Sequence, residues 1–282
     1  MVKTAVILTC HNRKLKTQEC LTSLGLYGRD YRLDVYLTDD GSTDGTSEMV
    51  EDLFPEVHII KGDGHLFWNR GMYKAWIVAL KNDYDFYLWL NDDVVLYSNC
   101  LDQMFKCSLL YQNKSIISGL IEDDKHQVIY GGYDAFKRLV QKSVKPSPIK
   151  FMHGNVVLIP KFVVDKIGIL DPVFYHDLGD VDYGLRALKN GVSIVSSAQP
   201  VAMGYRNNYC RVRKWNSNLI TRFRKLYEPL GSPPSINFYF RKRHFGLFNA
   251  IIYWLFLHFI NVLSDKMITI FGGNRYNDGV LE

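Results

Sequence analysis

The stretch Tyr87-Leu88-Trp89-Leu90-Asn91-Asp92-Asp93 decides how the rest of the chain is interpreted. Its four apolar residues run directly into an amide and two adjacent carboxylates. Such a run is typical of a strand buried in a parallel sheet, and open α/β sheets bind ligands at the carboxyl ends of their strands. Two neighbouring carboxylates repel each other unless a cation lies between them, and Mg²⁺ is commonly held by one or two carboxylates plus substrate phosphates. An isolated Asn-Asp-Asp would more often be a turn or a helix cap. Whether this one binds a ligand therefore has to be judged from the other motifs in the chain.

The composition indicates an ordinary globular protein. Its 282 residues, of which 47% are hydrophobic and 22% charged, suffice for one large domain or one domain with an appendage. The five cysteines include no Cys-x-x-Cys pair, which argues against a zinc site or disulfide framework and favours a reducing, cytosolic setting. Residues 1–3 lead directly into a short apolar strand, so we expect no signal peptide.

The net charge of +5 is concentrated in one region, because residues 201–250 hold ten Lys and Arg and only one acid. Nucleic acid, anionic lipid or a diphosphate would each suit such a region.

Strands and helices are expected to alternate over the first 200 residues. The apolar patterns predict strands at 4–9, 33–38, 57–60, 87–90, 116–120, 156–159 and 192–195. They predict helices at 14–26, 46–53, from about 69 onward, and at 99–112, 161–167 and 181–190. This alternation predicts an α/β fold, with a Rossmann-like parallel sheet covered on both faces. The first strand is followed by neither Gly-x-Gly-x-x-Gly nor a Walker sequence, which argues against a dinucleotide or P-loop site. Residues 121–150 are expected to be polar and irregular.

Four motifs follow one another in order: Asp-Asp-Gly-Ser-Thr-Asp-Gly-Thr at 39–46, Trp-Asn-Arg-Gly at 68–71, Asn-Asp-Asp at 91–93 and Gly-Asp-Val-Asp at 179–182. Together they resemble the family 2 glycosyltransferases with a GT-A fold, over roughly residues 4–200. The basic tail resembles a bacterial subgroup of rhamnosyl- and related polysaccharide glycosyltransferases. The resemblance implies a GT-A domain at 1–205, with a donor half at about 1–97 and an acceptor half at about 98–205. A basic and apolar helical extension would occupy 206–282.

The resemblance implies sugar transfer with inversion from a UDP- or dTDP-linked donor to a hydroxyl group. The acceptor would be a glycan or a polyprenyl-diphosphate-linked molecule in the synthesis of a bacterial surface polysaccharide, such as O-antigen or capsule. Asp180 would be the general base, with Asp177 as its rival. Asp93 would ligate Mg²⁺ or Mn²⁺, which neutralises charge that builds up on the leaving diphosphate.

Other positions that match the family are expected to bind the donor: Thr9, His11, Asp39, Asp40, Trp68, Asn69, Asn91 and Asp92. Some of them have a plainer alternative, since Asp39 and Asp40 could be turn residues and Trp68 could be a core aromatic. Asp182 and Arg186 have the spacing of a structural i, i+4 ion pair.

Two features depart from the family pattern. Gly179 stands where many relatives have glutamate, and no histidine follows the last strand, where residues 200–206 end in Arg206. Either the metal site is therefore weaker, or Arg206 acts as a fixed cation for the diphosphate. His153 and His176 are either acceptor-site residues or structural histidines.

Residues 245–263 contain no Asp, Glu, Lys or Arg, and they follow the basic triplet 241–243. We favour an amphipathic helix or helix pair in peripheral contact with the inner face of the cell membrane through 241–263, over a span or a homodimer contact. The interpretation assigns no nucleic-acid partner. The alternatives are a nucleotidyltransferase, a protein that binds nucleic acid or another anionic surface through 206–243, and a catalytically inactive subunit that binds a sugar nucleotide.

Overall fold

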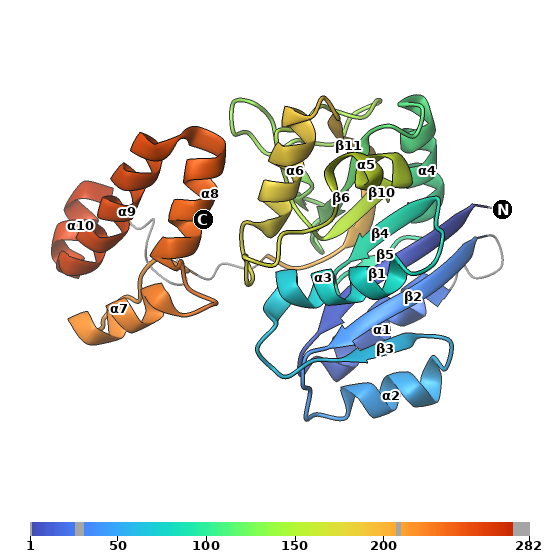
Figure 1. Cartoon of the computed structure of the whole chain (residues 1–282), viewed down its shortest axis with the longest axis horizontal. Helices are drawn as coiled ribbons and strands as arrows, with labels where there is room; N and C mark the ends of the chain where they lie inside the picture. Colours follow the sequence, from blue (N-terminus) through green and yellow to red (C-terminus); the bar gives the residue numbers. More distant parts are fainter. Residues whose placement is uncertain (1, 26–30, 207–209, 273–282) are drawn as a thin grey trace. The chain divides into compact units, whose positions relative to one another are not determined.

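The computed structural model describes residues 2–25, 31–206 and 210–272, and the chain divides into two compact units (Figure 1). The first unit comprises Met1–Pro172 and Gly179–Arg206, and the second comprises Val173–Leu178 and Asn207–Glu282. The domain limits derived from the sequence stay a prediction.

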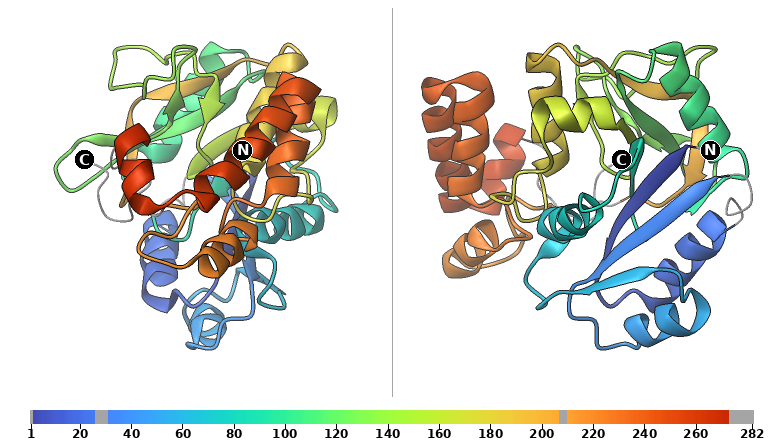
Figure 2. Two further views of the ribbon diagram at one scale, coloured as in Figure 1. Left: turned by 90° about the vertical axis from the view of Figure 1, so that its left-hand side faces the viewer. Right: turned by 45° about the vertical axis from the view of Figure 1, so that its right-hand side comes forward.

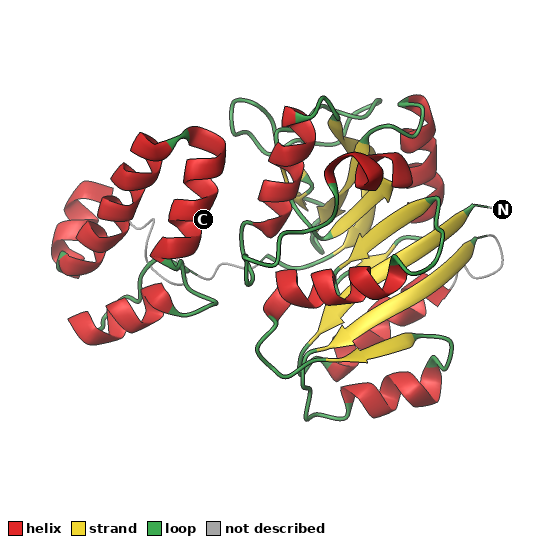
Figure 3. Ribbon diagram, in the orientation of Figure 1, coloured by secondary structure: helices red, strands yellow, loops and turns green. Residues whose placement is uncertain are grey.

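The first unit is built on a mixed sheet with the order β3-β2-β1-β4-β10-β6-β11-β5, to which β7 adds by pairing with β6 (Figure 3). Its strands are β1 (Lys3–Cys10), β2 (Arg32–Asp39), β3 (His58–Lys61), β4 (Phe86–Leu90), β5 (Val95–Leu96), β6 (Ile116–Glu122), β7 (Val128–Tyr130), β10 (Val156–Pro160) and β11 (Ile194–Met203). Two further short strands, β8 (Gly132–Tyr133) and β9 (Phe151–Met152), pair with each other.

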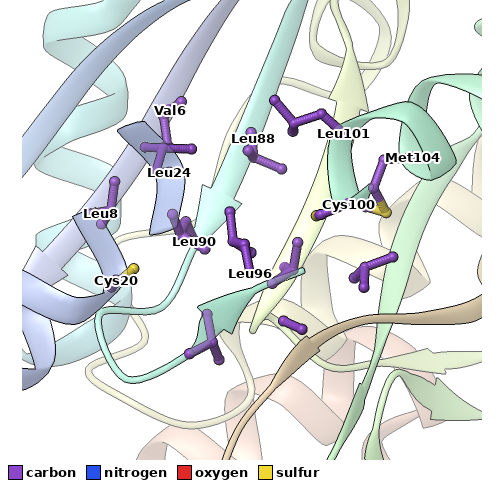
Figure 4. Close-up of a cluster of buried hydrophobic side chains, with 14 of the residues drawn as sticks. Val6, Leu8, Cys20, Leu24, Leu88, Leu90, Leu96, Cys100, Leu101 and Met104 are labelled. Atoms are coloured by element: carbon purple, nitrogen blue, oxygen red, sulfur yellow. The ribbon is translucent and has the colours of Figure 1, made fainter. Parts of the chain in front are cut away.

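Helices cover both faces of this sheet (Figure 2). Their bounds are α1 (Lys14–Gly25), α2 (Thr46–Leu53), α3 (Phe67–Ala79), α4 (Cys100–Leu110), α5 (Lys161–Ile167) and α6 (Gly179–Lys189). On one face, α1, α2 and α4 bury a cluster that includes Leu24, Leu88 and Leu101 (Figure 4). On the other, α3, α5 and α6 pack on Ile7 and Trp89. Alternate residues of each strand thus enter opposite cores, which explains the continuous apolar runs in the sequence.

The predicted α/β architecture is confirmed, and the arrangement of one strand shapes the functional edge. β3, β2, β1 and β4 are mutually parallel, whereas β10 runs antiparallel to both β4 and β6. The start of β10 therefore lies beside the end of β4, where the backbone amide of Asn91 donates to the backbone carbonyl of Asn155 at 2.8 Å. An antiparallel strand in this place brings residues 153–155 to the edge where the parallel strands end.

Two local predictions were incomplete. The last strand extends well beyond the expected 192–195, because register shifts between Ser196 and Ala202 accommodate Pro200 within it. The segment 121–150, expected to be irregular, contains β7 and β8.

The second unit contains α7 (Leu219–Tyr227), α8 (Pro234–Phe245), α9 (Leu247–Val262) and α10 (Asp265–Gly272). Arg213 is fully buried and, with Arg222, donates to the Leu263 carbonyl after α9 and pairs with Asp265. Cations at a helix carboxyl end satisfy carbonyls that lack intrahelical partners. Part of the basic charge concentrated in 201–250 is thus structural. No helix in the described part of the chain is long and apolar enough to cross a membrane.

Candidate functional site

Three predicted site residues, Trp68, Asn91 and Asp180, meet at the carboxyl edge of the sheet, and Trp68 connects the other two. Its indole Nε1 donates to Asn91 Oδ1 at 2.8 Å, and its ring packs edge-on against Trp89. The same ring lies so close to Gly154 that a Cβ there would be 2.6 Å from it. The Gly154 amide in turn donates to Asp180 Oδ2 at 2.9 Å. The end of β4, the start of α3, the turn before β10 and the start of α6 therefore form one continuous surface.

Asp180 has a fixed orientation in the first turn of α6. Its second oxygen, Oδ1, accepts from the Val181 amide at 2.8 Å, and the residue is partly exposed. Asp182 differs, because it is fully buried and accepts from Arg186 Nε at 2.8 Å. Arg186 also donates to the carbonyls of Ile167 and Ile169. The predicted structural role of the Asp182–Arg186 pair is confirmed.

The structure gives a steric reason for glycine at position 179. A Cβ on Gly179 would lie 1.9 Å from Asn69 Oδ1 and 2.6 Å from Asn69 Cγ. Asn69 is fully buried and donates to the Asp171 carbonyl at 2.8 Å. The Asn69 amide of α3 thus occupies the space that a side chain at position 179 would need.

Asp39 and Asp40 are both buried and make hydrogen bonds within the protein. Asp39 accepts from the Ser42 amide and the Ser47 hydroxyl. Asp40 accepts three backbone amides of the segment that leads into α3, from Gly64 at 2.8 Å and from Leu66 and Phe67 at 2.9 Å. These bonds are typical of carboxylates that fix loops, and Asp40 thereby positions the helix that carries Trp68 and Asn69. Their contact with a nucleoside stays a prediction.

Thr9 and His11 lie at the end of β1, beside these aspartates. The Thr9 hydroxyl donates to the Thr38 carbonyl at 3.1 Å and packs against Gly71 of α3, where a Cβ would be only 2.2 Å away. His11 Nδ1 lies 2.6 Å from the Asp40 carbonyl, so this nitrogen carries the proton and Nε2 accepts from Asn12. Both side chains support the loop that Asp39 and Asp40 form.

Arg13 is a site residue that the sequence interpretation missed. Its Nη1 lies 3.1 Å from Asp92 Oδ1 and 2.9 Å from Asp93 Oδ2, so one guanidinium nitrogen bridges both carboxylates. Burial raises the pKa of Asp92 to about 6, and Arg13 opposes this shift. The sequence held a signal for this contact, because Arg13 follows β1 just as Asp92 and Asp93 follow β4. Since β1 and β4 are neighbouring parallel strands, a basic residue after one strand lies close to acidic residues after the other.

The donor set at this edge suits a divalent metal that arrives with a ligand. Among the described residues no group of three or more His, Cys, Asp or Glu side chains could hold a metal ion. Asp93 is 32% exposed, whereas Asp92 is only 7% exposed. A single accessible carboxylate fits Mg²⁺ or Mn²⁺ that keeps several waters and takes further oxygens from phosphates.

The remaining predicted residues lie elsewhere. Asp177 belongs to the second unit, where it is 43% exposed and pairs with Arg211 at 2.7 Å. His176 Nε2 lies 3.8 Å from the same carboxylate. Arg206 is exposed at the end of the first unit, next to Tyr205, whose ring centre is 5.5 Å from the ammonium of Lys16 on α1. The end of β11 therefore lies near the helix that follows Arg13.

An apolar pocket adjoins the Asp180 segment. It has a volume of about 390 Å³ and is lined by Tyr133, Lys137, Phe151, Met152, His153 and Val181. His153 Nδ1 accepts from the Gly131 amide, and Tyr130 and Tyr133 pack edge-on against its ring. Burial lowers the pKa of His153 to about 4, so the ring is neutral at pH 7. His153 thus forms part of an aromatic wall.

The fold and this edge define an α/β enzyme of the glycosyltransferase type. The chain belongs to glycosyl transferase family 2, which matches residues 5–168. No curated protein matches the sequence.

Solved structures of S. aureus TarS share the fold. The TarS structure has a TM-score of 0.57 at 14% identity and covers 95% of this chain, which spans 45% of TarS. TarS 1–349 in complex with UDP-GlcNAc has a TM-score of 0.55 at 13% identity, with 96% of this chain and 76% of that chain covered. TarS 1–349 in complex with UDP has a TM-score of 0.57 at 13% identity, with 96% and 75% covered.

Proposed function

We propose that the chain transfers a sugar, with inversion, from a UDP- or dTDP-linked donor to a hydroxyl group of a glycan or lipid-linked acceptor. The observation that carries this proposal is the connected surface from Asn91 through Trp68 and Gly154 to Asp180. It joins a carboxylate of the proposed acceptor half to the strand ends of the proposed donor half. A carboxylate on one side of a bound donor is what inverting transfer to a hydroxyl requires.

In the proposed reaction Asp180 accepts the proton of the acceptor hydroxyl. The oxygen then forms a bond to the anomeric carbon from the face opposite the leaving group. The bond from that carbon to the diphosphate oxygen breaks, and its electron pair leaves with the nucleoside diphosphate. A positioned general base contributes about 10²–10⁴-fold to such a step. Asp177 is the alternative base.

Asp93 would hold Mg²⁺ or Mn²⁺, with Asn91 and Asp92 beside the water shell of the ion. When bound, the ion would neutralise charge on the diphosphate. Arg206 would add a fixed cation. The nucleoside would lie near residues contributed by β1, β2 and α3: Thr9, His11, Asp39, Asp40, Trp68 and Asn69.

The acceptor would enter through the pocket beside Val181. Aromatic walls suit the apolar face of a sugar ring, and Tyr133 is 36% exposed. Tyr133→Ala is expected to raise the acceptor KM at least tenfold, while donor binding stays unchanged because the residue lies outside the donor surface. Initial rates at varied acceptor concentration measure this, and an unchanged KM would exclude the pocket.

The second unit would bring the enzyme to the cytoplasmic face of a membrane. On α9 an apolar stripe is exposed, from Phe248 at 76% through Leu255 at 55% to Phe259 at 60%. Lys242, exposed near the end of α8, lies within the basic triplet 241–243. Aromatic and aliphatic side chains beside basic ones favour an anionic lipid surface, where a polyprenyl-diphosphate-linked acceptor would be found. This fits a rhamnosyltransferase-like role in the synthesis of a bacterial surface polysaccharide, with residues 1–205 as catalytic domain. The competing occupant of the stripe is a second copy of the chain.

Thermal unfolding with UDP, dTDP and GDP, each with and without Mn²⁺, tests the proposal. A ligand that binds only the folded state raises the unfolding temperature as its concentration exceeds its Kd. We expect a metal-dependent rise with UDP or dTDP that is lost in Asp93→Ala. No rise with any nucleotide would refute the donor site.

A further inference from the structure

We propose that Arg13 is an exchangeable counter-cation, which excludes free divalent metal from Asp93 until a donor arrives and then transfers to the donor's diphosphate. This inference rests on the proposed function and concerns the order in which metal and nucleotide bind. It starts from the bridge that Arg13 Nη1 makes at 3.1 Å to Asp92 and 2.9 Å to Asp93.

The backbone around Arg13 is held firmly. The backbone amide of Asn12 donates to the Ser42 hydroxyl at 2.9 Å, and the side-chain oxygen Oδ1 of Asn12 accepts from the backbone amide of Thr43 at 2.8 Å. On the other side, the Lys14 amide donates to Asp44 Oδ2 at 3.0 Å. Asn12 has a positive φ of 50°, which this residue type tolerates better than most. The loop between β1 and α1 is therefore clamped to the loop after β2.

The guanidinium itself can move, because the Arg13 side chain is 45% exposed. Within the described part of the chain the guanidinium pairs with Asp92 and Asp93 alone, and both pairs use one nitrogen, Nη1. A fixed backbone that carries a long, half-exposed side chain can exchange one anion for another without rearrangement of the fold.

Arg13 and a metal ion would compete for the same carboxylate. A metal bound to Asp93 would take electron density from the oxygen that Arg13 holds. The metal ion and the guanidinium would also repel each other, because both would contact the same carboxylate. Asp92 is buried and offers no alternative oxygen to solvent. In the absence of other anions the guanidinium therefore occupies the place that a free metal ion would take.

A nucleoside diphosphate changes this balance. Its phosphate oxygens accept two parallel hydrogen bonds from a guanidinium, which is a stronger arrangement than the single-nitrogen bridge to two carboxylates. The diphosphate also supplies oxygen ligands to the metal. Metal and nucleotide would therefore bind together, and each would bind weakly alone.

The test measures binding and not turnover. Binding of MnCl₂ without nucleotide is followed by electron paramagnetic resonance of the free ion, and UDP or dTDP binding with EDTA is followed by calorimetry. For Arg13→Ala we expect at least tenfold tighter binding of Mn²⁺ alone and at least tenfold weaker binding of nucleotide. Opposite changes from one substitution are not produced by general loss of structure.

Two further variants separate charge from size and from general effects. Arg13→Lys keeps the cation, so Mn²⁺ alone should bind as weakly as to the wild type. Lys161→Ala removes a cation of nearly equal exposure, 46%, that pairs with Asp83 near the opposite end of β4, and it should change neither affinity. If Arg13→Ala fails to fold, Arg13→Gln takes its place.

The outcomes distinguish the two proposals. If the wild type shows no rise in unfolding temperature with any nucleotide when Mn²⁺ is also present, the proposed donor site fails, whatever the result with Mn²⁺ alone. If the wild type binds nucleotide but Arg13→Ala and Arg13→Gln bind free Mn²⁺ no more tightly than it does, the role of Arg13 as a counter-cation is wrong. If Mn²⁺ binding tightens while nucleotide affinity stays unchanged, transfer of Arg13 to the diphosphate is wrong.

Discussion

Gly179→Ala tests whether Asn69 excludes a side chain from the start of α6. The new Cβ would lie 1.9 Å from Asn69 Oδ1, 2.6 Å from Cγ and 3.2 Å from Cβ. The Cγ distance does not depend on which end of the amide carries the oxygen. Because Asn69 is fully buried and bonded to the Asp171 carbonyl, it has no free space to move into.

Two opposing contributions set the change in the free energy of unfolding caused by Gly179→Ala. Alanine in place of glycine within a helix gains about 0.5–1 kcal/mol, and overpacking of a filled core costs about 1–3 kcal/mol. The clash is far inside van der Waals contact, so we expect a net loss of about 1–2 kcal/mol. This corresponds to a fall in unfolding temperature of roughly 2–8 °C.

Differential scanning fluorimetry of a double-mutant cycle measures this. Asn69→Ala removes both clashing atoms, so Gly179→Ala should cost little or nothing in that background. Gly25→Ala is the control, because a Cβ at this last residue of α1 meets nothing within 4 Å. An equal cost of Gly179→Ala with and without Asn69 would refute the steric explanation for glycine at position 179.

Three further predictions follow from the site and the second unit. Asp180→Asn should lower kcat by about 10²–10⁴-fold and leave the nucleotide-induced rise in unfolding temperature intact, and a smaller loss would favour Asp177 as the base. Burial raises the pKa of Asp92 to about 6 from 3.8, so the folded state holds this proton more tightly than the unfolded chain. The stability that this proton contributes is complete below pH 3.8 and is lost as the pH rises through 6. Asp92→Asn should therefore gain stability relative to the wild type between about pH 4 and 7.5, by up to about 3 kcal/mol, and a difference in unfolding temperature that does not change with pH would contradict this. Phe248→Glu combined with Phe259→Glu should abolish co-sedimentation with anionic vesicles, whereas Leu110→Glu, at a 70% exposed apolar position on α4, should not. Dissociation of a dimer by the double variant, without any vesicle binding by the wild type, would assign the stripe to self-association.

Much of the fold could be predicted because its signals are local. The runs that became β4 and β10 are apolar throughout, β1 has an apolar stretch at 5–8, and the structure buries both faces of these strands. Turn glycines such as Gly41 and Gly45, at φ of 69° and 80°, marked the loop after β2. The short strands β7 and β8 escaped prediction because their burial comes from distant pairing partners and not from their own composition.

The candidate site was predictable in outline for the same reason. The predicted motifs at 39–46, 68–71, 91–93 and 179–182 each follow or begin a regular element, and sheet topology brings such positions to one edge. The roles of individual side chains were harder to predict from the sequence. Nothing local indicates that Asp40 caps the segment before α3, since its donors lie 24–27 residues away.

The sequence by itself determined the fold class, the order of the elements and the family, because periodicity and motif spacing are properties of the chain. Tertiary structure alone decided which charges meet. Arg13 and Asp93 are 80 residues apart and become partners because β1 and β4 pair in parallel. In the same way Asn69 fills the space beside Gly179, and Arg213 is buried at the end of α9 although the sequence presents it as one of many surface bases. Electrostatic and steric complementarity depends on distance in space, and distance along the chain does not encode it.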